Sequence, residues 1–230
     1  MKFKPTPHRW SLTPKQAIRI QSKLAGKVIV RKPTRQLRYI VGVDLAFTSG
    51  LSHCIAAAVV WDRRDKHIVE SAYAKRPVRL PYIPGLLSFR EAPAVLAALR
   101  KVRHPVDAIM CDGHGLAHPR RFGIACHVGY ICNVSALGCG KSRLIGEHDD
   151  PAVRRGSSRP LKVGTEKVGL VLRTRDYVKP VYISVGHLID LDTARRVALD
   201  CACGYRLPEP TRQADILVAK LTRSDRGVTN

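Results

Sequence analysis

The sequence predicts an α/β fold in which helices flank a mixed β-sheet. Three strand-like segments follow one another closely in the first third of the chain, and short connections between successive strands are typical of an antiparallel meander. Beyond them, segments with helical periodicity alternate with short apolar runs, as expected where central strands are covered by helices. The length of 230 residues fits one domain of this kind.

The first third of the chain supplies one helix and the three strands. Apolar residues recur with helical spacing over residues 13–27, and Pro14 suits the first helical turn, where its missing N–H would have no partner. Arg38–Phe47 and His53–Asp62 are mostly apolar strand segments. His67–Ala74 alternates between apolar and polar residues and is the third strand.

The remaining elements alternate between helix and strand. In chain order we expect a helix at Glu91–Val102, a strand at Val106–Cys111, a helix at 121–132, strands at Val134–Leu137, Val168–Arg173 and Val181–Val185, and helices at Thr193–Cys203 and Thr211–Leu221. Asp192 suits the N-cap of the helix at 193, and Gly204 suits its C′ position. Residues 140–162 are rich in charge, Gly and Pro, and are expected to form the longest loop.

This order of elements is that of a ribonuclease H-like α/β fold, a mixed sheet with flanking helices. Residues 13–224 are expected to form the single domain. Residues 1–12 would be a flexible lead-in and residues 225–230 a C-terminal tail.

The charge balance indicates a polyanionic partner. The chain has 40 Lys and Arg against 18 Asp and Glu, a formal net charge of +22. Such an excess favours nucleic acid. The basic residues occur in short clusters, one of which is Arg31, Lys32, Arg35 and Arg38. Because no single basic tail carries the charge, we expect it to lie on the folded body.

The sequence also predicts where the protein is located and how it assembles. No apolar segment approaches the roughly 20 residues needed to span a bilayer, so no membrane association is expected. Residues 1–10 lack the apolar core of a signal peptide. The seven cysteines include no CxxC pair, which favours a reducing, cytoplasmic compartment. We expect a monomer.

Three carboxylates occupy positions where a metal-dependent nuclease needs them. Asp44 lies within an apolar strand, where an unpaired carboxylate would be costly to bury. Asp112 directly follows another apolar strand, at the strand end where ligand sites gather in α/β sheets. Glu91 is expected at the start of a helix. Closely placed carboxylates can bind one or two divalent cations for phosphodiester cleavage.

Several long segments sharpen this prediction. Residues 81–91 (PYIPGLLSFRE) and residues 112–121 (DGHGLAHPRR) resemble signature segments of the endonuclease V family, also called deoxyinosine 3′ endonucleases. Gly42-Val-Asp44, residues 138–143, residues 184–187 and residues 204–212 are similar to further segments of that family, in its order. The resemblance runs from about residue 40 to about residue 220.

The resemblance implies roles for particular residues. Asp44, Glu91 and Asp112 would be the acidic metal ligands and catalytic carboxylates, with Asp215 as a fourth candidate ligand. The family relationship implies Mg²⁺ as the cofactor, with Mn²⁺ able to substitute. Lys141 would be the active-site cation, and a compact ammonium suits the charge that develops on a phosphate. His118 matches a family residue near the scissile strand and is expected to be catalytic, whereas His114 lacks that support.

The resemblance also implies a wedge and a base pocket. The wedge, which separates the strands of DNA, would be Pro81, Tyr82, Ile83 and Pro84. The pocket for the extruded hypoxanthine would be formed by Leu87, Gly113, Gly115, Gly123 and Ile124. Stiff prolines and a flat tyrosine ring suit the replacement of a lost base stack. Glycines let backbone groups meet the edge of the base.

The family relationship implies an endonuclease that recognises deoxyinosine in double-stranded DNA and hydrolyses the second phosphodiester bond 3′ to the lesion. Two alternatives remain. The first is a ribonuclease H-like nuclease acting on inosine-containing RNA or branched nucleic acid, because discrimination of the 2′-OH is not visible in the sequence. The second is a nucleic-acid-binding domain that has lost turnover, although the intact acid set and Lys141 argue against it.

Overall fold

The meander forms one half of a mixed sheet. In a computed structural model that describes residues 1–227, β1 (Tyr39–Phe47) pairs antiparallel with β2 (His53–Asp62), and β2 pairs antiparallel with β3 (His67–Pro77). A short 3₁₀ turn, η1 (Ser49–Leu51), connects β1 to β2. The predicted antiparallel meander is therefore confirmed, with β3 extending three residues beyond its predicted end.

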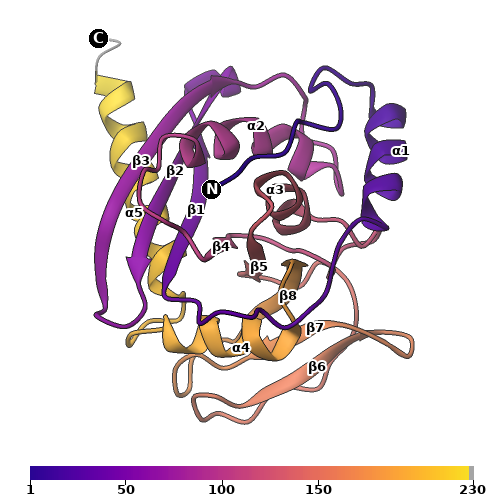
Figure 1. The fold of residues 1–230 in the computed structure, drawn as a ribbon, viewed down its shortest axis with the longest axis vertical. Helices are drawn as coiled ribbons and strands as arrows, with labels where there is room; N and C mark the ends of the chain where they lie inside the picture. Colours follow the sequence, from indigo (N-terminus) through magenta and orange to yellow (C-terminus); the bar gives the residue numbers. More distant parts are fainter. Residues whose placement is uncertain (228–230) are drawn as a thin grey trace.

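The other half of the sheet combines parallel and antiparallel pairs. β4 (Ala108–Cys111) lies parallel to β1 and to β5 (Ser135–Gly140). β8 (Val181–His187), β7 (Glu166–Leu172) and β6 (Ser158–Val163) then continue as antiparallel neighbours. Within the described residues the order is β3-β2-β1-β4-β5-β8-β7-β6, one eight-stranded sheet (Figure 1). This mixed sheet with flanking helices is the predicted fold.

Five helices flank the sheet in the part of the chain that the structure describes. They are α1 (Pro14–Ala25), α2 (Leu87–Leu99), α3 (Ile124–Cys132), α4 (Leu191–Asp200) and α5 (Glu209–Gly227). Thr13 caps α1 in a capping box with Gln16. The predicted N-cap of α4 is wrong: Asp190 accepts a hydrogen bond from the Thr193 N–H at 2.6 Å, two residues before Asp192.

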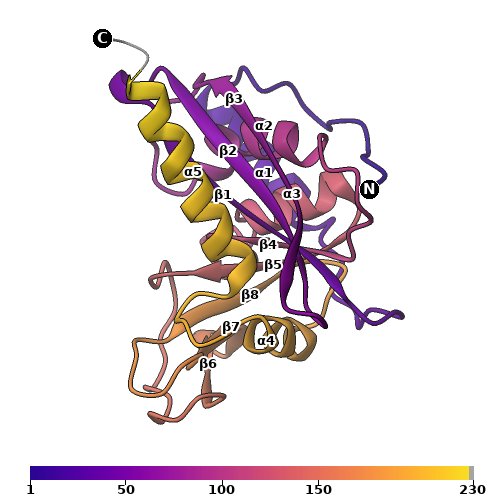
Figure 2. The ribbon, with the colours of Figure 1, turned by 90° about the vertical axis from the view of Figure 1, so that its left-hand side faces the viewer.

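The helices form layers on both faces of the sheet because side chains alternate along each strand. Val41 and Val43 face α2 and α3. Ile40 and Met110 face α4 on the opposite side. α5 covers the same side as α4, where it packs over β1 and β2 (Figure 2). These layers leave the two parallel strands β1 and β4 at the centre of the molecule.

The N-terminal residues are packed rather than loose. Residues 1–12 contain no helix or strand, yet the Lys4 N–H donates to the Ile131 carbonyl at 2.7 Å. The His8 Nε2 atom lies 2.8 Å from His127 Nε2, and the Trp10 ring packs against His127. The expectation of a flexible lead-in is corrected by these contacts with α3. At the other end, α5 continues through Gly227, so the predicted tail begins inside a helix and residues 228–230 lie outside the described residues.

None of the helices in residues 1–227 combines the length and the apolar character that crossing a bilayer requires.

Candidate active site

The central parallel strands bring two predicted acids to one edge of the sheet. Val43 on β1 is the register partner of Cys111 on β4, so Asp44 and Asp112 are the next residues along two adjacent strands. The Asp112 N–H donates to the Val43 carbonyl at 3.2 Å. Because both strands run in the same direction, the two carboxylates emerge at the same end.

Two helices contribute the remaining acids. Glu91 is the fifth residue of α2, not its first, because the helix begins at Leu87. It lies close enough to Asp44 and Asp112 for both charges to raise its pKa. Asp215 projects from α5 and hydrogen-bonds with Asp44. The structure therefore brings together all four acids that the sequence predicted as metal ligands.

Burial and the charges of neighbouring acids make Asp44 and Glu91 bind protons tightly. Burial raises the pKa of Asp44 to about 8, and the charge of Asp112 and the hydrogen bond with Asp215 act in the same direction. Burial likewise raises the pKa of Glu91 to about 8, with the charge of Asp44 as the second cause. Such perturbed carboxyl groups are typical of functional sites.

Lys141 supplies positive charge on one side of the acids. Its Nζ lies 2.6 Å from Asp112 Oδ2 and 3.5 Å from Asp215 Oδ1. Burial lowers the pKa of Lys141, but the hydrogen bond with Asp112 and the surrounding acid charges outweigh burial and raise it overall. Arg206 donates to the backbone carbonyls of Lys141 and Lys179, which fixes the loop that carries the lysine.

The donor set suits a hard divalent cation. Within the described residues, no three or more His, Cys, Asp and Glu side chains are already arranged around a common metal position. Mg²⁺ does not require such a cage, because one or two carboxylates usually hold it together with water and substrate phosphate. Burial, and after it the charges of neighbouring acids, raises the pKa values of Asp44 and Glu91, so a cation there would stabilise their charged forms.

A cavity of about 290 Å³ opens beside these acids. Leu87, Gly113, Gly123 and Ile124, four of the five predicted pocket residues, line it, and Asp112 and Lys141 form part of the same wall. Gly115 is not among its lining residues. The Gly115 N–H donates to Ser184 Oγ at 2.8 Å, and a Cβ there would lie 1.9 Å from the Val185 carbonyl oxygen. Gly115 therefore allows close packing on β8.

The predicted wedge borders the cavity and is anchored at its base. Tyr82 and Pro84 line the cavity, and the Tyr82 side chain is 66% exposed. Directly after the wedge, the Gly85 carbonyl accepts hydrogen bonds from three side chains: Gln21 Nε2 at 3.0 Å, Arg120 Nη2 at 2.8 Å and His118 Nε2 at 3.1 Å. We call this arrangement the Gly85 clamp.

His118 belongs to this clamp. Its Nε2 donates to the Gly85 carbonyl, and its Nδ1 accepts from the Arg120 N–H at 3.1 Å. Burial and the nearby charge of Arg120 lower the pKa of His118 to about 4. The ring is therefore neutral near pH 7, and both of its nitrogens are engaged in hydrogen bonds. These contacts connect His118 to the residue that follows the predicted wedge, and its expected catalytic role stays a prediction.

Sequence reasoning missed Gln21, although a signal for it exists. Gln21 is fully buried on α1, where Ala17 and Leu24 lie on the same buried face. A polar residue at helical spacing between apolar core residues needs buried partners. Gln21 has three, because it also donates to the Phe122 carbonyl at 2.7 Å and accepts from Arg120 Nε.

Replacing Gln21 with Leu is expected to lower the free energy of unfolding by about 1–3 kcal/mol, because buried carbonyls and Arg120 lose their partner. Urea denaturation measures the change. Arg19→Leu, on the exposed side of α1, is the matched control and should stay within about 0.5 kcal/mol of the parent protein. Equal stability of the two variants would contradict a structural role for the clamp.

The fold and the site together define a ribonuclease H-like protein with an acidic centre of the nuclease type. Comparison with known proteins identifies the family. The endonuclease V family model matches residues 22–216. This chain belongs to the endonuclease V family.

Individual relatives agree with this assignment. An endonuclease V from Trichormus variabilis is 49% identical over 214 residues, which cover 93% of this chain and 97% of the relative. The crystal structure of an endonuclease V from Streptomyces avermitilis is 41% identical, with a TM-score of 0.90 over 96% of this chain and 97% of the other. Endonuclease V of Ciona intestinalis, in complex with a 24mer DNA containing an inosine followed by a ribo-adenosine, shares the fold at 22% identity, with a TM-score of 0.79 over 91% and 98% of the two chains.

Proposed function

We propose that this protein is a divalent-metal-dependent endonuclease that nicks double-stranded DNA near deoxyinosine and so initiates repair. One observation carries the proposal: four carboxylates and Lys141 lie together beside a cavity that Tyr82 borders, with Asp112 and Lys141 in the cavity wall. A cleavage centre and a base-sized pocket thus share one wall. The family relationship supports cleavage at the second phosphodiester bond 3′ to the lesion.

Asp44 and Asp112 would hold the cation, with Glu91 and Asp215 beside them. When bound, Mg²⁺, or Mn²⁺ in its place, would supply Lewis-acid polarisation of the phosphodiester. Lys141 would place its ammonium next to the same phosphate and stabilise the negative charge that develops there. Arg206 would keep Lys141 in position through the backbone of its loop.

The cavity suits a flat, polar base. Within the described residues, Ser88 Oγ and His114 Nδ1 are buried and have no hydrogen-bond partner, and both residues line the cavity. Buried polar atoms without partners are rare in folded proteins, and hypoxanthine offers groups that could satisfy them. Flipping a base out of the duplex costs a few kcal/mol, less where pairing is already weak, which favours a deaminated base.

The inosine-containing DNA bound by the Ciona protein supports this substrate class. The ribo-adenosine that follows the inosine in that complex favours a second candidate, cleavage of inosine-containing RNA. In both cases the same pocket and acids would act, and the difference would lie in contacts with the 2′-OH.

The test is incubation of the protein and Mg²⁺ with four end-labelled substrates: a duplex with one deoxyinosine, the same duplex with a ribonucleotide after the inosine, an inosine-containing RNA strand and an undamaged duplex. We expect a nick one nucleotide beyond the inosine in DNA and none in the undamaged duplex. Cleavage of RNA alone would establish the second candidate. Uncleaved substrates throughout would contradict both.

Replacing Tyr82 with Ala is expected to reduce nicking of the inosine-containing duplex about ten- to a hundredfold. The reason is that a base stacked on the ring would lose about 1–3 kcal/mol of stacking energy. A single-stranded inosine substrate should be much less affected, since no duplex must be opened. Single-turnover rates on both substrates measure the effect. Tyr177→Ala removes another exposed tyrosine, 74% accessible and outside the cavity lining, and should leave both rates unchanged. Equal losses on both substrates would contradict a wedge role.

A further inference from the structure

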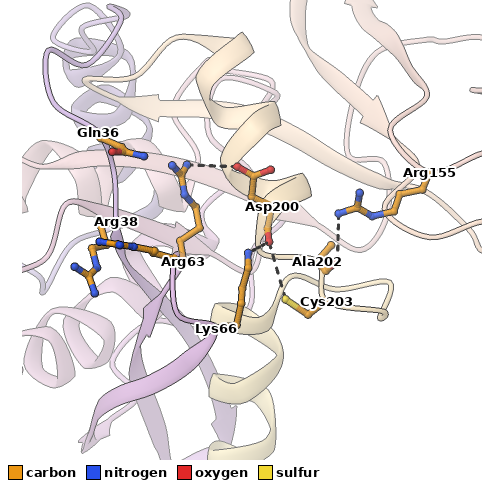
Figure 3. A pocket seen from close by; sticks show the side chains of 9 residues that line it. Gln36, Arg38, Arg63, Lys66, Arg155, Asp200, Ala202 and Cys203 are labelled. Carbon is orange, nitrogen blue, oxygen red and sulfur yellow. Dashed lines mark hydrogen bonds and ion pairs between the residues drawn. The ribbon is translucent and has the colours of Figure 1, made fainter.

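A second hollow lies away from the acids and is strongly basic. We call it the basic cleft: a space of about 640 Å³ whose cations are Arg38, Arg63, Arg64, Lys66 and Arg155, with Asp200 as the acid in its lining. Figure 3 shows Arg63 and Lys66, both from the turn between β2 and β3, and Arg155 from a separate segment, around the end of α4. The proposed nicking reaction uses none of these residues.

The basic cleft opens at the opposite end of β1 from the acids. Its residues flank the register pair Tyr39 and Asp62, at the start of β1 and the end of β2. Asp44 lies five residues further along β1, a separation of about 17 Å in an extended strand. A ligand in the cleft would therefore contact a different part of the protein from the phosphate at Asp44.

The cations of the cleft differ in how much of their charge is compensated. Arg38 forms ion pairs with Asp62 and Asp65 at 2.7 Å each, so its charge is neutralised locally. Lys66 and Arg155 instead donate to the backbone carbonyls of α4, to Asp200 at 2.5 Å and to Leu199 at 2.7 Å. A carbonyl orients a cation but carries no net charge, so these two side chains are held in place with their charge available.

The positive charge continues beyond the cleft. An adjoining hollow of about 420 Å³ shares Arg63 and Asp200 with it and adds Lys32, Arg35 and Arg196. The cations thus lie along a path beside α4 and do not converge on one point. A single small anion would need converging donors, whereas a chain of phosphates matches charges spread along a surface.

We propose that the basic cleft and its extension past Arg35 bind the sugar–phosphate backbone of nucleic acid outside the segment held at the acids. The cleft would add sequence-independent affinity and would engage duplex that extends beyond the lesion. The proposal rests on the proposed function only in taking nucleic acid as the substrate class.

The test compares two charge-reversed proteins of equal net charge. Arg35→Glu/Arg64→Glu alters two exposed cations of the path, and Lys101→Glu/Arg103→Glu alters two exposed cations that line none of the hollows described above. Undamaged duplexes are the probes, one just long enough for the acids and the wedge and one several times longer. Affinity is measured across a range of salt concentrations, and thermal melting checks that each variant is folded.

We expect the cleft variant to lose roughly tenfold or more in affinity for the long duplex, with a salt slope smaller in magnitude by about 2, or about 1 per phosphate-contacting residue. Its affinity for the short duplex should change no more than that of the control variant. An equal change in the control, or equal losses on short and long duplexes, would overturn the proposal. Because binding of undamaged duplex is the readout, a protein that failed to nick inosine would leave this result unaffected.

Discussion

An Asp44→Asn variant is expected to nick inosine-containing duplex at least roughly a thousandfold more slowly than the parent protein. Asp44 interacts with several groups of the site: it hydrogen-bonds with Asp215, and the charges of Asp112 and Lys141 shift its pKa. An amide keeps the size of the side chain but removes the charge that would hold a cation. Binding of the duplex should persist or become tighter, because a negative charge is lost near the phosphates.

Single-turnover nicking and an equilibrium binding assay separate these effects. Asp192→Asn is the matched control, because Asp192 is exposed in the first turn of α4, away from the site. Its rate should equal that of the parent protein. Nicking by the Asp44→Asn variant within tenfold of the parent rate would remove Asp44 from the catalytic centre. Loss of binding together with nicking would favour a structural role.

Removal of metal with a chelator is expected to abolish nicking, and the Mg²⁺ concentration that restores it should fall as pH rises. Asp44 and Glu91 have pKa values raised to about 8 in the metal-free protein, so a cation must displace their protons to bind. For each proton displaced, Mg²⁺ affinity should rise about tenfold per pH unit below about pH 8 and level off above it. Calorimetry in buffers of different ionisation enthalpy counts the protons released.

The raised pKa values of Asp44 and Glu91 also determine how the stability of the metal-free protein changes with pH. Asp44 and Glu91 bind protons more tightly in the folded protein than in the unfolded chain, where the carboxyl pKa lies near 4. The metal-free protein should therefore lose stability as pH rises from about 4 through about 8. Mg²⁺ should restore the melting temperature most strongly above pH 8. Mg²⁺ affinity that is constant from about pH 6 to about pH 8 would contradict proton displacement.

The strands that could be predicted from the sequence are those whose own apolar residues favour a buried strand. β1 and β2 are mostly apolar segments joined by a short connection, so their positions and pairing could be anticipated. β6 could not be anticipated: it contains Arg159, Pro160 and Lys162, and all but its last residue lay in the predicted long loop. It is a strand because β7 pairs with it, a tertiary effect that overrides a weak local preference. Asp192 was predicted as the cap of α4, but the backbone places the cap two residues earlier, at Asp190.

In the site too, some features follow from local sequence and others only from tertiary contacts. The acids, Lys141 and most of the cavity residues belong to segments that resemble the family, so their grouping could be predicted. Gly115 and His118 belong to the same segments, yet their hydrogen bonds with Ser184 Oγ and the Gly85 carbonyl could not be anticipated from those segments. Gln21 lies 64 positions before its partner Gly85. No local pattern reveals a partner at that distance along the chain.

The position of α5 has a consequence for synthesis of the protein on the ribosome. α5 begins directly against β1, where a Cβ on Gly42 would lie 1.9 Å from the Pro210 backbone, and it carries Asp215 to Asp44. Translation produces the sheet acids well before this helix, which is the last described element to be made. A nascent chain would therefore expose the bare face of β1 and an incomplete acid centre. Docking of α5 would cover this face of β1 and add Asp215 to the other acids.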